Sequence, residues 1–166
     1  MKPEPTVRVQ FRARCLPLLV GLLFLLQLVV PYKGWMILLV GLGGAWLAGF
    51  LWARSLARGL ELNREMRYGW AQVGDHLQER FTLVNRGRAP APWVAIMDHS
   101  TLPGYQVSTV MGVGERAVKH WFEQGVCERR GLYTLGPTSL QTGDPLGFYD
   151  VILEYSSSTT MMVMPP

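Results

Sequence analysis

Two long apolar runs, joined by a short turn, dominate the first third of the chain. Residues 15–32 give 18 positions without a charge, and residues 34–53 give 20. A helix rises about 1.5 Å per residue, so each run can cross most of a hydrocarbon core roughly 30 Å thick. Between the runs, Pro31-Tyr32-Lys33-Gly34 supplies a helix break and side chains suited to the headgroup layer. The pattern predicts a two-helix transmembrane hairpin over residues 15–59, ending at Gly59.

Small residues recur every four positions in the second run, at Gly41, Ala45 and Gly49. This spacing places them on one helix face, where the lack of bulky side chains lets another helix approach closely. We expect this stripe to pack against the first helix, with Gly21 as its counterpart.

Two other interpretations of the apolar runs stay open. Arg8, Arg12 and Arg14 precede the first run, as in a cleaved signal peptide, but no small-x-small cleavage site follows Val30. Two buried helices of a soluble protein would also be apolar, but the second run has tryptophans at both ends and no polar face. The residues favour the membrane hairpin.

From Leu60 onward the period of the pattern changes from helical to two. Residues 77–85 show this most clearly, because Leu77, Phe81 and Leu83 alternate with polar side chains. Turn residues separate such segments at intervals typical of antiparallel all-β domains. We therefore expect a membrane α-helical hairpin plus an antiparallel immunoglobulin-like β-sandwich over residues 60–166. The expected strands are 60–68, 77–85, 93–97, 106–111, 116–122, 126–135, 138–142, 151–155 and 161–164.

The positions of the charges indicate on which side of the membrane the sandwich lies. The formal net charge is +4, and the basic residues gather on either side of the apolar runs, whereas the turn offers Lys33 alone. Those flanking residues are Lys2, Arg8, Arg12, Arg14, Arg54, Arg58, Arg64 and Arg67. The positive-inside rule then predicts a multi-pass protein of the inner (cytoplasmic) membrane with its sandwich in the cytoplasm.

Residues 1–14 are expected to form a basic tail that is disordered or lies on the membrane. Nucleic acid is not an expected partner, because no basic stripe is interleaved with aromatic residues.

Catalytic, cofactor-binding and metal-binding residues are not indicated by the pattern. Asp98-His99-Ser100 holds the residue types of a hydrolase triad, but neighbouring strand residues point to opposite faces and cannot form the relay among themselves. The histidines lack the spacing of a zinc site, and Cys15 and Cys127 lie far apart. Trp70, just after the first expected strand, is expected on the membrane side. We expect a non-enzymatic chain with no cofactor and no small-molecule substrate.

Three short motifs stand out in the second half of the chain. They are Arg130-Gly131-Leu132-Tyr133-Thr134-Leu135-Gly136-Pro137, Asp144-Pro145-Leu146-Gly147-Phe148 and Val163-Met164-Pro165. Together with the preceding pair of apolar runs, they resemble the domain of unknown function fifty-eight family. The resemblance implies a bacterial or archaeal inner-membrane protein, often encoded beside a MoxR-type AAA+ ATPase and von Willebrand A-like proteins, with no established catalytic activity. Longer family members continue into a von Willebrand A-like domain, so we expect either a short member or a fragment here.

These signature residues predict architecture rather than chemistry. Gly131 allows a bulge or a close backbone approach, Gly136-Pro137 ends a strand, and Asp144-Pro145-Leu146-Gly147 has the residue order of a type I turn. Arg130 and Asp144 are expected to pair and to pin this turn to the strand. The family-signature residues are Arg130, Gly131, Tyr133, Gly136, Pro137, Asp144, Pro145 and Gly147.

The pattern and the resemblance together predict a membrane-anchored, non-catalytic β-sandwich scaffold or interaction module. Its expected partners are the lipid bilayer and other proteins, with an AAA+ ATPase as the class that the resemblance implies. The alternatives are a membrane-associated hydrolase and an envelope-facing adhesion domain.

Overall fold

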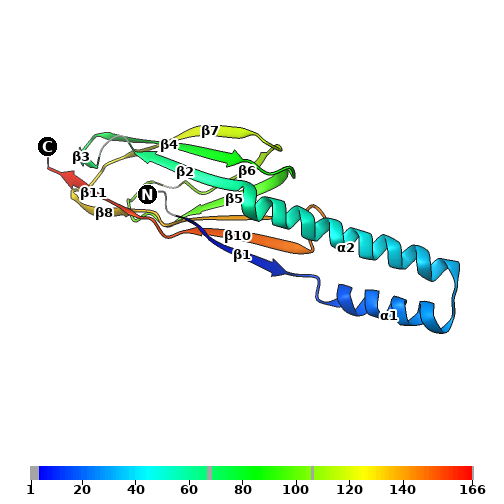
Figure 1. The fold of residues 1–166 in the computed structure, drawn as a ribbon. Coiled ribbons are helices and arrows are strands. Elements are labelled where there is room, and N and C mark those ends of the chain that lie inside the picture. The colour runs from blue at the N-terminus through cyan, green and yellow to red at the C-terminus, as the bar shows by residue number, and fades with distance from the viewer. Residues whose placement is uncertain (1–3, 67–68, 106, 166) are drawn as a thin grey trace.

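The computed structural model describes residues 4–66, 69–105 and 107–165, so Lys2, Arg67 and Tyr68 lie outside the described residues. Figure 1 shows an elongated β-sandwich with a pair of helices projecting from one end. In chain order the elements are β1 (Thr6–Phe11), α1 (Cys15–Val29), α2 (Lys33–Gly59), β2 (Leu60–Met66), β3 (Trp70–Gln72), β4 (His76–Asn85), β5 (Ala91–Asp98), β6 (Thr109–Val113), β7 (Val118–Val126), β8 (Gly131–Leu135), β9 (Thr138–Gly143), β10 (Tyr149–Tyr155) and β11 (Thr159–Met164).

The two helices pack together as a helical hairpin, and α2 ends at Gly59 as predicted. With 27 residues, α2 is long and apolar enough to cross a membrane, and it is the one such helix among the described residues. The helix α1 has 15 residues, or about 22 Å of length, because the backbone of Val30 is already extended ahead of Pro31. The first helix is therefore shorter than the apolar run that predicted it.

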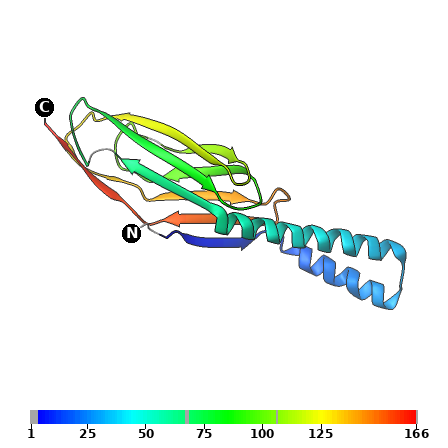
Figure 2. The ribbon, with the colours of Figure 1, turned by 45° about the horizontal axis from the view of Figure 1, so that its top comes forward.

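Three sheets form the sandwich. A five-stranded sheet with the order β1-β10-β9-β5-β6 faces the β2-β4-β7 sheet, and the β3-β11-β8 sheet lies at the end remote from the helices (Figures 1 and 2). The β3–β11 pair is parallel, and the other pairs of described strands are antiparallel. The predicted β-sandwich architecture is confirmed at this level.

The core of the sandwich follows from the period-two pattern. On β4, Leu77, Glu79, Phe81 and Leu83 are all buried, as their alternation with exposed residues predicted, although Glu79 is an acid. The opposite sheet contributes side chains that are buried as deeply, namely Val94, Ile96, Leu140, Val151 and Leu153. Burial of each large aliphatic side chain is worth about 1.5–3 kcal/mol, so this interface stabilises the domain substantially.

The N-terminal segment is not the disordered or membrane-lying tail that we expected. Residues Thr6–Phe11 form β1, which pairs with β10 from Thr6 opposite Glu154 to Phe11 opposite Tyr149. Apolar side chains at positions 7, 9 and 11 alternate with polar ones, which is a strand pattern. The sandwich domain therefore includes β1 in addition to residues 60–166, and both chain segments that flank the hairpin are part of it.

One predicted strand is two strands in the structure. We expected residues 126–135 to form a single long strand, but β7 ends at Val126 and β8 begins at Gly131. Between them, the Cys127 amide donates to the Asp75 carbonyl over 3.0 Å, and the Cys127 carbonyl accepts from the Gly74 amide over 2.9 Å. These bonds hold the bend, after which the chain passes from the β2-β4-β7 sheet to the β3-β11-β8 sheet.

Candidate functional site

The last turns of α2 are built into the sandwich, which forms a helix–sandwich junction. Ala53 and Leu56 are fully buried in the same core cluster as the strands. Two indole groups fix the helix at this level: Trp46 Nε1 donates to the Tyr149 hydroxyl over 2.8 Å, and Trp52 Nε1 donates to the Pro90 carbonyl over 3.0 Å. At this end the hairpin is joined directly to the sandwich, because α2 continues into β2 without a linker.

The glycine at the base of this junction allows a backbone crossing. A Cβ atom added to Gly59 would lie 2.5 Å from the Gly87 backbone nitrogen, which is closer than atoms approach without a shift. Asn85 holds the Gly87 loop in place, since its side-chain oxygen accepts from the Gly87 amide and its amide donates to the Ala89 carbonyl, each over 2.9 Å. The predicted helix end at Gly59 thus has a steric reason, in addition to the general tendency of glycine to end helices.

The small-residue stripe does not pack against α1 as we predicted. Added Cβ atoms at Gly41 and at Gly21 would meet no other atom within 4 Å, so these positions are not sites of close helix approach. At Gly49 the neighbours are Asp144 and Phe148 of the sandwich, each 3.2 Å from an added Cβ, while Ala45 is partly buried. The close contact belongs to the helix–sandwich junction rather than to the helix pair.

Asp144 organises the loop that meets Gly49. Its carboxylate is buried and accepts from the Leu146 amide over 3.0 Å and from the Tyr149 amide over 2.6 Å. The Gly147 amide donates to the Asp144 carbonyl over 3.1 Å, which confirms the predicted turn, and Gly147 takes a positive φ of 74°. Pro145, between them, is exposed.

The predicted ion pair between Arg130 and Asp144 is wrong. Arg130 is exposed just before β8, at the end of the sandwich remote from the helices, whereas Asp144 lies against α2 (Figure 1). Backbone amides occupy the carboxylate instead, because a buried acceptor must be satisfied locally.

The other signature residues have structural partners. Gly131 begins β8, and the Tyr133 hydroxyl donates to the Arg129 carbonyl over 3.0 Å. Gly136 has a φ of 89°, its amide donates to Ser100 Oγ over 2.9 Å, and an added Cβ would lie 2.8 Å from the Ser157 carbonyl oxygen. With Pro137, which follows a cis peptide bond, it ends β8 as predicted.

A buried ionic cluster that the sequence analysis missed connects the two main sheets. Arg64 on β2 binds both carboxylate oxygens of Glu79 on β4, with Nη2 to Oε2 at 2.7 Å, and its Nη1 lies 2.9 Å from Oδ1 of Asp98 on β5. The Tyr105 hydroxyl donates to Glu79, and the Ser100 hydroxyl donates to Asp98. The sequence pattern did contain a sign of this ion pair, because Arg64 and Glu79 both occupy inward-facing positions of their strands.

The pKa shifts of this cluster have clear causes. Burial alone would lower the pKa of the Arg64 guanidinium, but hydrogen bonding and attraction to Glu79, with attraction to Asp98, outweigh it and raise the pKa. Burial, and then hydrogen bonding to Glu79 and the charge of that carboxylate, raise the pKa of the Tyr105 hydroxyl. Arg64 therefore stays charged and Tyr105 stays protonated at neutral pH.

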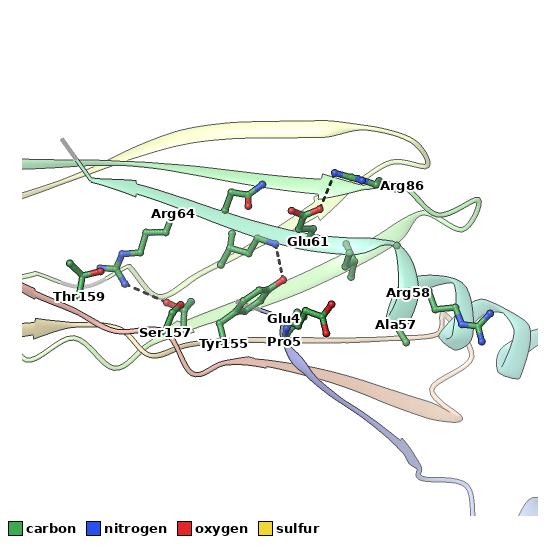
Figure 3. A pocket seen from close by; sticks show the side chains of 15 residues that line it. Glu4, Pro5, Ala57, Arg58, Glu61, Arg64, Arg86, Tyr155, Ser157 and Thr159 are labelled. Atoms are coloured by element: carbon green, nitrogen blue, oxygen red, sulfur yellow. Dashed lines mark hydrogen bonds and ion pairs between the residues drawn. The ribbon is translucent and has the colours of Figure 1, made fainter. Parts of the chain in front are cut away.

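The open side of this cluster is a groove of about 690 Å³ between β2 and the β10–β11 segment (Figure 3). Glu61 and Arg64 line one wall, Tyr155 and Ser157 line the other, and Arg58 lies at the end next to α2. The Leu62 amide donates to the Tyr155 hydroxyl over 2.9 Å, and Arg86 pairs with Glu61 over 3.1 Å. Because Glu79, Asp98 and Thr138 already engage Arg64, the guanidinium of Arg64 is not available to an anionic substrate in the groove.

The triad residue types are used structurally. The Ser100 hydroxyl donates to Asp98 and accepts from the Gly136 amide, while His99 is exposed. Within the described residues, no group of three or more His, Cys, Asp or Glu side chains is placed to hold a metal ion. The arrangement provides an architectural polar core in which Ser100 is bonded to Asp98 and Gly136 rather than to His99. Elsewhere, the Thr82 hydroxyl lies 2.9 Å from Nδ1 of His120, as an exposed cross-strand pair of β4 and β7.

An exposed apolar row crosses the sheet at the far end of the sandwich. Trp70, Met162 and Leu132 lie directly opposite one another on β3, β11 and β8, and they are 57%, 48% and 68% exposed. Their strand neighbours Ala71 and Val163 are buried, so the row faces outward. The expectation that Trp70 lies near the membrane side is wrong, because β3 is at the end opposite the helices (Figure 1).

The comparisons with known proteins add little beyond the architecture. No protein-family model matches the chain, and no curated protein matches it. The CARDB domain of the PF1109 protein from Pyrococcus furiosus is similar at 10% identity and a TM-score of 0.45, over 65% of this chain and 96% of that chain. The human complex of zinc 2-glycoprotein and prolactin inducible protein gives 10% identity and a TM-score of 0.47, over 64% of this chain and 97% of that chain. At such values the sandwich assignment rests on the strand pairing of this chain, and no activity or partner follows.

Proposed function

We propose that this chain is a membrane-anchored, non-catalytic β-sandwich module. In this proposal the α1–α2 hairpin lies in the bilayer of the inner membrane, and the sandwich presents its far end to protein partners in the cytoplasm. An AAA+ ATPase of the MoxR type is the partner class implied by the resemblance of the signature residues to the domain of unknown function fifty-eight family.

The observation that carries the proposal is the exposure of the hairpin together with the burial of its base. The most apolar 18-residue window of α2 is 11% buried, whereas the core helix of a soluble protein would be mostly buried. Leaving large aliphatic side chains in water costs about 1.5–3 kcal/mol each, so a covering of lipid is the natural environment of this surface. The base of α2 lies inside the sandwich core at Ala53 and Leu56, which argues against removal of the hairpin as a signal peptide.

The charges at the two ends of the hairpin support the cytoplasmic side. Arg8, Arg12, Arg14, Arg54 and Arg58 lie around its base, against Lys33 at its tip. Arg64 no longer counts toward this balance, because its guanidinium is paired with the buried carboxylates of Glu79 and Asp98.

Cysteine labelling tests the anchor and its orientation. In a Cys15→Ser background, with the buried Cys127 retained, Lys33→Cys should react with an impermeant maleimide in intact spheroplasts, and Glu115→Cys should react only after the membrane is permeabilised. Reaction of Glu115→Cys in intact spheroplasts would place the sandwich outside and favour the envelope-facing alternative. Release of the unlabelled protein by carbonate washing would refute the anchor.

Co-purification tests the partner surface. Mild detergent extraction of the tagged chain from native membranes should recover an AAA+ ATPase, and the paired change Leu132→Ser with Met162→Ser should remove it. The matched control is Val110→Ser with Val118→Ser, which alters two exposed apolar residues outside the row. Loss of the ATPase in both variants, or in neither, would show that the row is not the binding surface.

A further inference from the structure

An apolar recess lies where β1 runs beside the base of α2. It has a volume of about 370 Å³ and is lined by Val7 and Val9 of β1 and by Phe50, Arg54, Ala57 and Arg58 of α2. We call this feature the junction recess. Its volume is within the range of about 300–1,000 Å³ that small-molecule sites occupy.

The register of β1 against α2 explains why the recess is apolar. Phe11 contacts Trp46, with ring centroids 6.0 Å apart, so the strand face that carries Phe11 is turned toward the helix. Val7 and Val9 share that face, because side chains alternate along a strand. Both valines are nevertheless exposed, which leaves apolar surface that the folded chain does not cover.

Two cations form the polar rim of the junction recess. Arg54 and Arg58 are one helical turn apart and both exposed, so they project from the same side of α2. Two nearby arginines of the N-terminal segment have acidic partners, since Arg8 pairs with Glu154 and Arg12 pairs with Asp150. Within the described residues, neither Arg54 nor Arg58 takes part in an ion pair, so the rim presents two uncompensated positive charges.

The recess also continues the apolar surface of the hairpin. Leu47, Phe50 and Leu51 are exposed on α2, and the next turns toward the sandwich carry Arg54 and Arg58. Along this side of the helix, an apolar surface therefore gives way to a cationic one within two turns. An anionic phospholipid has the same order of chemistry, with acyl chains below a phosphate.

We infer that the junction recess binds one anionic phospholipid. Its acyl chain lies over Val7, Val9 and Phe50, and the guanidinium groups of Arg54 and Arg58 hold its phosphate. This inference rests on the proposed function, because it requires the base of the hairpin to lie at headgroup depth. It goes further by assigning a lipid class and a site to the surface between β1 and α2.

Native mass spectrometry of the full chain, released from nanodiscs of defined composition, tests the inference. Nanodiscs that contain equal amounts of phosphatidylglycerol and phosphatidylcholine should yield protein that retains phosphatidylglycerol preferentially. The variant Arg54→Gln with Arg58→Gln should lower that preference about tenfold or more, since each basic residue at a membrane surface contributes appreciably to anionic lipid binding. The control Arg129→Gln with Arg130→Gln makes the same change in net charge at the far end of the sandwich and should keep the preference.

A second variant separates the acyl chain from the phosphate. Val7→Ser with Val9→Ser should lower lipid retention while the arginines remain, and excess inorganic phosphate should not displace the lipid from the wild-type chain. Displacement by phosphate would assign the site to a free anion instead.

The outcomes also separate this inference from the proposed function. A chain that carbonate washing releases from membranes would refute the anchor itself. A chain that stays integrated but retains both lipids equally, or whose preference survives the Arg54 and Arg58 changes, would overturn the lipid site alone.

Discussion

Arg64 binds Glu79 through three N–H···O contacts of 2.7 to 3.1 Å, and its remaining nitrogen lies 2.9 Å from Asp98. Glu79 belongs to the β2-β4-β7 sheet and Asp98 to the five-stranded sheet, so one guanidinium connects the two layers of the sandwich. Two carboxylates share a single arginine here, and hydroxyl groups of Tyr105, Ser100 and Thr138 provide the remaining donors.

Removal of Arg64 should be among the most destabilising single changes in the sandwich. Arg64→Met leaves two buried carboxylates without their cation, and breaking a buried pair typically costs about 3–5 kcal/mol. Urea denaturation of the purified chain in detergent, followed by tryptophan fluorescence, measures this loss. Arg80→Met, on the exposed face of β4, should stay within about 0.5 kcal/mol of wild type. Equal effects of the two changes would show that the cluster does not stabilise the fold.

Tyr105 should make the stability of the sandwich fall at alkaline pH. Burial and Glu79 raise its pKa in the folded chain, so above pH about 10 the unfolded chain loses this proton while the folded chain keeps it. The stabilisation is fully present below pH about 10 and is lost as the pH rises, at about 1.4 kcal/mol per unit.

Tyr105→Phe should remove that contribution to the slope. Burial also raises the pKa of Tyr155, although the hydrogen bond from the Leu62 amide opposes the shift, so a smaller alkaline slope should remain in the variant. Urea denaturation across a pH series checks this, and an unchanged slope in Tyr105→Phe would contradict it.

The alternation of apolar and polar side chains predicted the sandwich correctly, and it also placed two charged residues at inward positions. Arg64 lies on the same parity of its strand as Leu60 and Leu62, and Glu79 lies between Leu77 and Phe81, so an acid and a base at inward positions of paired strands indicated a buried ion pair. Val7, Val9 and Phe11 showed the same period in the segment that we expected to be a tail.

Other features required the fold itself. Asp98 joins Arg64 only because β5 and β2 lie in opposite sheets, which no spacing in the sequence encodes. The four-residue spacing of Gly41, Ala45 and Gly49 correctly marked a small helix face, but it could not show that the sandwich loop at Asp144 is the neighbour of Gly49. Arg130 and Asp144 likewise flank the consecutive strands β8 and β9, which belong to different sheets, so their proximity in sequence did not bring them together.

The glycines of α2 should differ sharply in their tolerance of a methyl group. At Gly59 an added Cβ would lie 2.5 Å from the backbone of Gly87, so Gly59→Ala should destabilise the junction by about 1–3 kcal/mol. Gly41→Ala meets no atom within 4 Å and gains helix propensity, so it should be neutral or stabilising by up to about 1 kcal/mol. Thermal unfolding in detergent compares them. If Gly41→Ala were the more damaging change, that result would support the predicted packing of the small-residue stripe against α1.

Asp144 should matter more than its neighbour Asp150. Asp144→Ala removes the acceptor of the Leu146 amide and leaves the buried amide of Tyr149 unsatisfied, at a cost of about 1–3 kcal/mol for the buried group. Asp150→Ala removes only the pair with Arg12, at 3.7 Å on the surface, and should cost less than about 1 kcal/mol. The two variants can be compared by the same thermal unfolding assay, and similar losses would argue against the loop as a support of the junction.

The attachment of the hairpin at two points has a mechanical consequence. The helix α2 passes into β2 without a linker, and β1, which precedes α1, is paired along its length with β10. A sandwich on a flexible stalk would swivel freely relative to its helices. Here only residues 12–14 separate β1 from α1, and the Arg12 amide is bonded to the Phe148 carbonyl, so little freedom is left for a hinge. In the proposed arrangement, torque applied at the row formed by Trp70, Met162 and Leu132 would therefore reach the helices as a tilt, with the whole sandwich acting as the lever arm.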